Sequence, residues 1–274
     1  MRTGRGRPRA AGADRAAAGP AAGLLGEGLP GGLPRCVSGV PSMTVHDIAR
    51  TERIEMYLKA IYTVAHNAPP VTVSKVAEYM GVAPPSAYEM LKRLEAQGLV
   101  QASAGAGYGL SERGLATARK VVRRLRLAER LLTDVLRVDL PDVYAEACKL
   151  EHVISPTVEA RLAEVLGHPA TCPHGLPIPG EAACEDDGDL LTLDRVPVWG
   201  RATVVSIPEE DRAIVAHLAA LGILPGAVVQ VREIGLLDGP VTVEVRHQIR
   251  ALGRALAQRV RVRPQVGDTG PAGA

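Results

Sequence analysis

Three residues that can bind a transition metal follow one another at helical spacing. Cys148, Glu151 and His152 stand at positions i, i+3 and i+4. On an α-helix this spacing places the three side chains on one face. A thiolate, a carboxylate and an imidazole together supply most of the ligands of a divalent transition-metal site. By itself the same spacing also fits a buried cysteine beside a surface glutamate–histidine pair, with no metal.

The segment upstream of the triplet has the pattern of a winged helix-turn-helix. Apolar residues at i, i+4, i+7 and i+8 predict a helix from Thr44 to about Ala65, which the Asn-Ala-Pro-Pro run at 67–70 ends. Thr72 or Ser74 can cap a short helix over 74–80, and a second short helix follows over 85–97. Two short helices joined by a tight turn are typical of DNA-binding helix-turn-helix motifs. Residues 99–103 and 108–110 then predict a β-hairpin wing.

The rest of the chain predicts a helical region and a small β domain. Helices are expected over 112–137, over the segment that carries the triplet, and over 157–166, and their surplus apolar faces suggest dimerisation. Residues 167–198 are rich in proline, glycine and acid, and we assign 181–198 as a linker. Beyond it we expect an SH3-like barrel, with a helix over 209–221 and strands at 201–206, 228–232, 241–245 and 260–262.

Composition narrows the class of protein. Of 274 residues, 46% are apolar, which suffices for packed cores although Phe is absent. The small net charge of +2 hides a basic 43–130 region, with 13 basic and 8 acidic groups, and an acidic 131–200 region, with 4 basic and 13 acidic groups. The first suits phosphates and the second suits cations. Four cysteines without a CxxC pair, and no apolar run that could span a bilayer, predict a cytoplasmic protein with free thiols and no membrane partner.

The second short helix of the motif carries the residues that we expect to meet DNA. In a helix-turn-helix, the residues that open this helix face base edges in the major groove. Ser86 offers an adaptable hydrogen bond and Glu89 can accept from cytosine. Lysines, arginines and serines nearby can contact phosphates, although a solvated surface charge is the ordinary role for several of them. The predicted DNA-binding residues are Ser74, Lys75, Pro85, Ser86, Glu89, Lys92 and Arg93.

Five motifs in order resemble the diphtheria-toxin-repressor family of iron- and manganese-dependent transcriptional regulators. They are residues 51–62 (TERIEMYLKAIY), 84–94 (PPSAYEMLKRL), 127–134 (LAERLLTD), 146–154 (EACKLEHVI) and 172–179 (CPHGLPIP). The resemblance covers roughly residues 44–263, and its last part is similar to the FeoA-like SH3 domain of the longer members. It implies a three-domain homodimer that binds a palindromic operator when divalent metal is present.

The resemblance also implies the metal ligands. Carried over by motif, the primary site consists of Met56, Cys148, Glu151 and His152. Two sulfur ligands favour Fe(II), with Co(II) or Ni(II) as substitutes in vitro, over the harder Mn(II). Members that sense manganese tend to have carboxylates at the two sulfur positions. Fe(II) is therefore the expected cofactor, and Mn(II) is the alternative.

The chain departs from the family at the ancillary metal site. Glu129 matches one ligand there, but Leu125 and Tyr144 stand where the family has histidines. Leucine cannot bind a metal, so this site is expected to be absent or rebuilt. Asp211 is a weak candidate for an oxygen ligand. For Cys172, His174 and Cys184 we favour a structural turn over a second soft-metal site, because their spacing is irregular.

These patterns predict an α+β multidomain protein. It consists of a tail (1–42, disordered or preceding a true start at Met43), a winged-helix DNA-binding domain (43–115), a helical metal-binding and dimerisation domain (116–180), the linker, an SH3-like β-barrel (199–264) and a second tail (265–274). The predicted function is a metal-activated, homodimeric transcriptional repressor of metal-homeostasis genes. No hydrolase, nucleotide-binding or dinucleotide-binding motif is present, so no enzymatic activity is predicted. Two alternatives remain: a metal-handling adaptor without regulated DNA binding, and a constitutive DNA binder.

Overall fold

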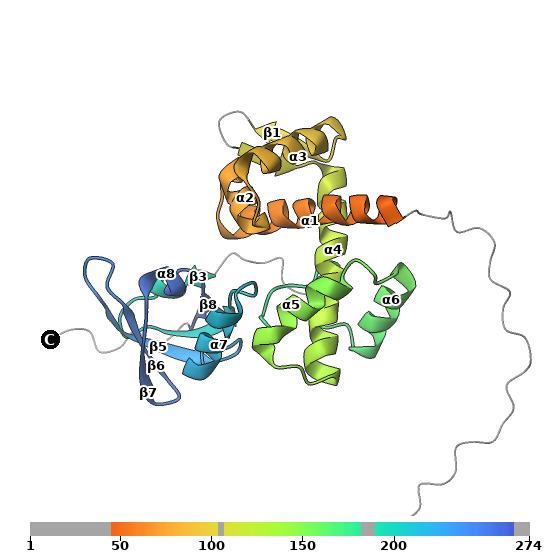
Figure 1. Ribbon diagram of the computed structural model, residues 1–274. Coiled ribbons are helices and arrows are strands. Elements are labelled where there is room, and N and C mark those ends of the chain that lie inside the picture. Colours follow the sequence, from red (N-terminus) through yellow and green to blue (C-terminus); the bar gives the residue numbers. More distant parts are fainter. Residues whose placement is uncertain (1–44, 104–106, 182–189, 266–274) are drawn as a thin grey trace, which may run out of the picture. The chain divides into compact units, whose positions relative to one another are not determined.

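The computed structural model describes residues 45–103, 107–181 and 190–265 (Figure 1). The predicted tails, Cys36, Cys184 and the turn of the wing lie outside the described residues. Within them an N-terminal group of short helices with a hairpin is followed by a helical region and then by a β-sheet domain. This α+β arrangement is the predicted one.

The N-terminal region is the predicted winged helix-turn-helix. Thr72 is the N-cap of the second helix, where its Oγ1 accepts from the Lys75 N–H at 3.3 Å, and Gly81 ends that helix with a φ of 63°. Leu58, Ile61, Leu91 and Leu94 are fully buried and join the three helices. The elements are α1 (Val45–Asn67), α2 (Val73–Met80), α3 (Pro84–Ala96), β1 (Val100–Ser103) and β2 (Gly107–Leu110).

The wing is attached to the segment between α1 and α2. The Tyr108 N–H donates to the Val71 carbonyl at 2.9 Å. Gly107 has a φ of 90°, and a Cβ on it would lie 2.1 Å from the Val71 carbonyl oxygen. Only glycine allows this approach, so the position of the hairpin depends on it.

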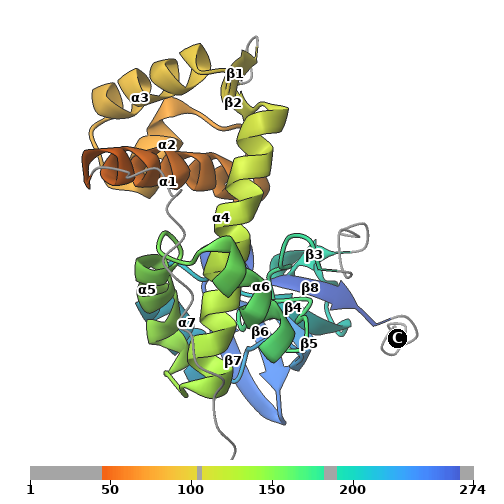
Figure 2. The same cartoon turned by 90° about the vertical axis from the view of Figure 1, so that its right-hand side faces the viewer.

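Helix α4 connects the winged helix to the metal-binding region. It spans Glu112–Arg130, begins at Ser111 as N-cap, and packs on α1 as well as on α5 (Leu140–Leu150) and α6 (Pro156–Val165) (Figure 2). The predicted single helix to residue 137 is wrong in its last part. Residues Leu131–Val135 form a π-helical turn, η1, in which the Leu136 N–H bonds to the Leu131 carbonyl five residues back.

Part of the proline- and glycine-rich segment is folded against α4. Ile178 is buried with Leu127 and Ala163, and Arg123 Nη1 donates to the Pro179 carbonyl at 2.8 Å. The linker predicted at 181–198 is too long at its C-terminal end, because β3 (Leu191–Thr192) and the 3-10 turn η2 (Leu193–Arg195) already belong to the β domain. Leu193 is fully buried in that domain's core.

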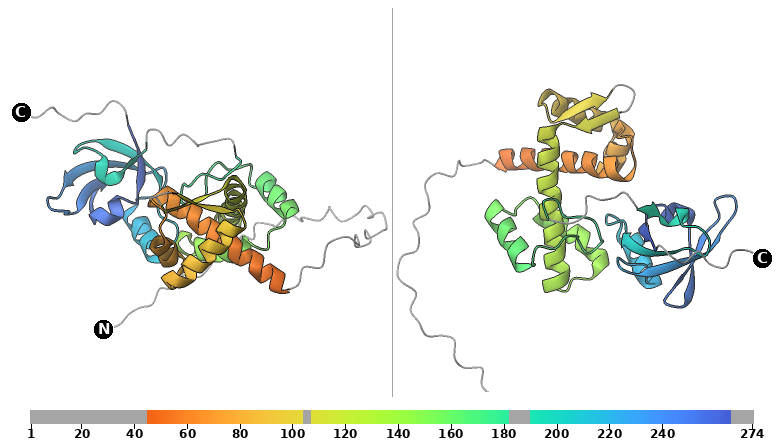
Figure 3. Two further views of the ribbon diagram at one scale, coloured as in Figure 1. Left: turned by 90° about the horizontal axis from the view of Figure 1, so that it is seen from above. Right: turned by 180° about the vertical axis from the view of Figure 1, so that it is seen from behind.

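The C-terminal domain is a six-stranded antiparallel sheet in the order β3-β8-β4-β5-β6-β7 (Figure 3). Alternate residues of β4 and β6 are buried, as expected for strands with one face toward a core. The prediction did not include β7 and α8. The remaining elements are β4 (Arg201–Ser206), α7 (Arg212–Leu221), β5 (Val228–Ile234), β6 (Val241–Val245), β7 (Gln248–Leu252), α8 (Arg254–Ala257) and β8 (Arg261–Pro264).

Among the described residues, no helix has the length and apolar character needed to cross a lipid bilayer.

Candidate functional site

The metal-ligand triplet lies at the C-terminal end of α5. Cys148 is in the last turn, Glu151 is the C-cap, and His152 follows in a turn. The helix thus ends one residue before the second predicted ligand. Glu151 keeps helical dihedrals, with φ −55° and ψ −31°, and its N–H bonds to the Ala147 carbonyl at 3.0 Å. The predicted spacing is therefore retained as far as Glu151.

A buried lysine from α1 lies between two of the expected ligands. Lys59 Nζ is 2.5 Å from Glu151 Oε1 and 3.6 Å from Cys148 Sγ. Lys59 is 5% exposed and Glu151 is 1% exposed. The ammonium acts as a stand-in cation: it shows that the sulfur and the carboxylate converge on one positive charge. These donors fit a divalent transition metal, which prefers mixed sulfur, nitrogen and oxygen ligands.

His152 joins the same group and is oriented by a carboxylate of α1. Its Nε2 is 3.2 Å from Glu151 Oε1, and its Nδ1 is 2.8 Å from Glu55 Oε2. Metal-binding histidines commonly use their second ring nitrogen in this way. Arg124 of α4 completes the arrangement, because it donates to the Glu151 carbonyl at 3.3 Å and its Nη2 lies 3.8 Å from Glu55 Oε1. The triplet therefore meets both α1 and α4.

Two of these groups hold protons at neutral pH. Burial raises the pKa of Cys148 to about 11, although the Lys59 ammonium opposes the shift. Hydrogen bonds to Glu151 and Glu55 raise the pKa of His152 to about 9. A metal binds the thiolate and the free imidazole nitrogen, so binding at this site must release protons.

Met56, the fourth predicted ligand, lies at the surface. It is on α1 three residues before Lys59, which places it on the same helical face. Its side chain is 41% exposed. The structure thus brings Cys148, Glu151 and His152 together, while Met56 stands one helical turn away from the ammonium that marks their common point.

The predicted base-reading residues lie on the exposed side of α3. Pro85, Ser86 and Glu89 are exposed, whereas Ala87, Met90 and Leu91 are buried under them. Lys92 and Arg93 are also exposed, as is Ser74 on α2. The prediction did not include Tyr88, which is 48% exposed and has the Lys92 ammonium 5.9 Å from its ring centre.

Lys75 has structural contacts in addition to its predicted phosphate role. Its ammonium donates to the carbonyls of Ala68, Pro69 and Pro70 at 2.7, 3.3 and 3.2 Å. These bonds satisfy carbonyls at the end of α1. A lysine in this position joins α2 to the preceding loop.

The residues at the expected ancillary positions have other roles. Leu125 is 2% exposed and belongs to the core of the helical region. Tyr144 packs beside it, with its hydroxyl 3.1 Å from the hydroxyl of Tyr79. Asp211 is the N-cap of α7, and its Oδ1 accepts from two backbone N–H groups. Glu129 is fully buried, and its Oε1 lies 3.4 Å from Nδ1 of His174, a residue for which the sequence favoured a structural role.

Three family models match successive parts of the chain. Residues 50–107 match the N-terminal DNA binding domain of iron dependent repressors, and residues 111–180 match their metal binding and dimerisation domain. Residues 191–264 match the FeoA domain. The three matches follow the three regions of the fold.

Curated relatives and solved structures agree with these matches. The iron-dependent repressor IdeR of Mycobacterium tuberculosis is 34% identical over 221 residues, which cover 76% of this chain and 95% of the relative. The diphtheria toxin repressor of Corynebacterium efficiens is 40% identical over 190 residues, 65% of this chain and 81% of that protein. A manganese-dependent transcriptional repressor, solved in complex with manganese, superposes with a TM-score of 0.71 at 30% identity, covering 77% of this chain and 100% of the other.

Proposed function

Since this chain belongs to the diphtheria-toxin-repressor family, and is therefore a metal-dependent DNA-binding transcriptional repressor, we propose that the ion that activates it is Fe(II). The observation that supports this choice is the position of the Cys148 thiol. It faces the same ammonium as the buried Glu151 carboxylate. A sulfur ligand at that point favours Fe(II) over Mn(II), which prefers oxygen ligands.

Four residues would hold the ion: Cys148, Glu151 and His152 from the end of α5, and Met56 from α1. The ion would supply a positive charge and directed bonds that join the two helices. Lys59 supplies the same charge in its absence and pairs with Glu151. Glu55 orients the His152 ring through Nδ1, which leaves Nε2 for the ligand role. Because α1 packs in the core with α2 and α3, a change at α1 reaches the DNA-binding helix.

The repressor binds DNA as a dimer, and we propose a palindromic operator, because two-fold proteins read two related half-sites. Unpartnered apolar side chains on the helical region support dimerisation there. Val153 is 71% exposed and Leu136 is 59% exposed, and Val165 on α6 is 76% exposed. We expect such residues to be covered by the partner chain. Metal-homeostasis genes are the expected targets.

The metal is tested by operator binding under anaerobic conditions. Fluorescence anisotropy with the promoter DNA next to the gene, at constant salt, is measured while Fe(II) or Mn(II) is added. We expect half-maximal activation at a lower concentration of free Fe(II) than of free Mn(II). The reverse order would identify a manganese sensor.

A constitutive DNA binder is the second candidate, and Lys59 is the observation that favours it. An ammonium already joins α1 to the end of α5 without any metal. If this ion pair fixes the active form, metal-free protein binds the operator as tightly as metal-loaded protein. The anisotropy titration distinguishes the two candidates by its starting point before metal is added.

A further inference from the structure

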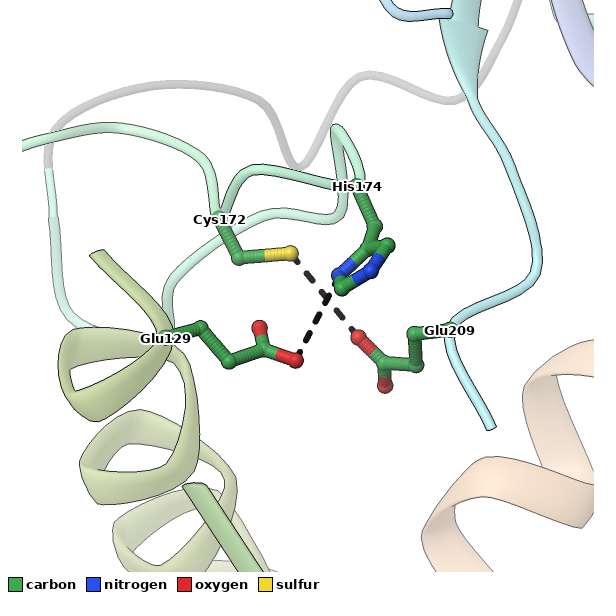
Figure 4. A group of neighbouring side chains, drawn as sticks. All are labelled: Glu129, Cys172, His174 and Glu209. Atoms are coloured by element: carbon green, nitrogen blue, oxygen red, sulfur yellow. Dashed lines mark hydrogen bonds and ion pairs between the residues drawn. The ribbon is translucent and has the colours of Figure 1, made fainter. Parts of the chain in front are cut away.

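We infer that Glu129, Cys172, His174 and Glu209 form a second, closed metal site that takes a zinc-like divalent ion. All four side chains point toward one centre (Figure 4). One ligand atom from each of them can be chosen such that all four lie within 4.8 Å of one another. The site is separate from the primary triplet and shares no residue with it.

The spacing of the four groups suits a tetrahedral ion. His174 Nδ1 is 3.4 Å from Glu129 Oε1, and Cys172 Sγ is 3.8 Å from Glu209 Oε2. Ligands on one tetrahedral zinc, with bonds of about 2.0–2.3 Å, are roughly 3.3–3.8 Å apart. Two pairs of the cluster thus have nearly the separation that a shared ion would give them.

Polar atoms at the centre of the cluster have no hydrogen-bond partner. Both carboxylate oxygens of Glu129 and both ring nitrogens of His174 are buried and unsatisfied. Glu129 and His174 are both 0% exposed, so bulk water cannot replace the missing partners. Buried polar groups in this state cost free energy unless they bind something. A metal ion would satisfy one nitrogen and at least one oxygen together.

The charges at the cluster also call for a cation. Glu129 and Glu209 are two buried carboxylates, and Arg126 Nη2 is 3.9 Å from Glu209 Oε1. Burial and the nearby Glu129 raise the pKa of Glu209 to about 7, and burial raises the pKa of the Cys172 thiol well above its usual value. A divalent ion together with the Cys172 thiolate and Arg126 would exactly offset the two carboxylates.

The ligands come from three separate segments of the chain. Glu129 is in the last turn of α4, Cys172 and His174 are in the loop after α6, and Glu209 precedes α7 of the FeoA domain. That loop already contacts the FeoA domain, because the Ile207 N–H donates to the His174 carbonyl at 3.0 Å. An ion at this point would join the helical region to the FeoA domain. Leu125 and Tyr144 take no part in it, so the site is built from a different ligand set.

Four protein ligands in a dry environment are typical of a structural metal site, which is closed to substrate and exchanges slowly. The mixture of one thiolate, one imidazole and two carboxylates suits Zn(II), and Co(II) as its spectroscopic substitute. The ion is thus a fixed component of each chain, distinct from the ion that regulates DNA binding.

The test uses full-length protein in which the primary site has been removed by Cys148→Ala and Glu151→Ala. After dialysis against dilute chelator, elemental analysis is expected to find one zinc per chain. Adding Cys172→Ser and His174→Ala should reduce this to zero, whereas Cys184→Ser, outside the described residues, should leave it unchanged. Zinc content that is zero before the additional substitutions, or that persists after them, overturns the proposal.

A cobalt spectrum keeps the test decisive if the quadruple variant does not fold. Co(II) added to zinc-free Cys148→Ala protein is expected to give tetrahedral d–d bands and a thiolate-to-cobalt charge-transfer band. Cys172→Ser alone should abolish the charge-transfer band. A band that remains, or octahedral spectra throughout, contradicts the site. Neither measurement involves DNA, so its failure is distinct from a failure of Fe(II) activation.

Discussion

The ammonium of Lys59 on α1 and the carboxylate of Glu151 at the end of α5 form a buried ion pair, with Nζ and Oε1 2.5 Å apart. They are 92 residues apart in the sequence. The pair connects the winged-helix domain to the metal-ligand triplet and places a positive charge next to two expected ligands. It therefore links protein stability to metal binding.

Replacing Lys59 should expose this link. In metal-free protein, Lys59→Gln leaves the Glu151 carboxylate buried without its partner, which should lower the free energy of unfolding by about 3–5 kcal/mol. Saturating Fe(II) should recover most of the loss, because the ion replaces the ammonium. Urea unfolding with and without Fe(II) measures both. Lys92→Gln is the matched control, since its exposed ion pair with Glu95 should contribute less than about 1 kcal/mol. An equal loss with and without metal would contradict the account.

The stability of metal-free protein should depend on His152 and on pH. The pKa of this histidine is about 9 in the folded protein and ordinarily 6.5, so folding favours its protonated form. Its stabilising effect is complete below pH 6.5 and disappears as pH rises to about 9. His152→Gln should therefore cost most at pH 6 and least above pH 9. Unfolding curves in chelator at both pH values check this, and a cost that grows with pH would refute it.

Leu125 should prove to be a core residue without influence on metal content. It is 2% exposed and packs with Ala128, Leu132 and Val143. Leu125→Ala should lower stability by about 2–5 kcal/mol through the cavity that it creates. The number of metal ions per chain, measured by elemental analysis, should stay at the wild-type value. A lost ion would show that this position belongs to a metal site.

Arg93 should contact phosphate and not a base. It is exposed on α3, beyond the residues that open the helix. Arg93→Ala should weaken binding to operator and to unrelated DNA by similar factors and reduce the slope of log K against log salt by about 1. Arg161→Ala, on exposed α6, is the control and should change neither. Loss of operator binding alone would assign Arg93 to sequence recognition.

Much of this arrangement could be predicted from local patterns. Thr72, Gly81 and Ser155 mark helix ends by their own chemistry, and all three act as caps. The spacing of Cys148 and Glu151 likewise depends only on the helix that carries them. The residues that complete each site come from distant segments, so no local pattern indicates them.

The misses have physical causes. Lys59 follows Met56 in a helical pattern that does not reveal which side chain will meet Glu151. Asp211 was chosen over Glu209 because both precede α7, yet Asp211 is used in capping. The π-helical turn η1 interrupts a helix whose apolar periodicity continues through it. Strand β7 has mostly exposed side chains and so lacks the alternation that identifies a half-buried strand.

Operator affinity with and without Fe(II), compared between the wild type and the Cys148→Ala, Glu151→Ala double variant, tests the central claim most directly. Anaerobic fluorescence anisotropy at fixed salt, with a thermal melt to confirm folding, gives both values. The account predicts that Fe(II) tightens wild-type binding by about 5- to 150-fold and leaves the folded double variant unchanged. An equal response of both proteins to Fe(II), or metal-free wild-type binding as tight as the metal-loaded form, would contradict it.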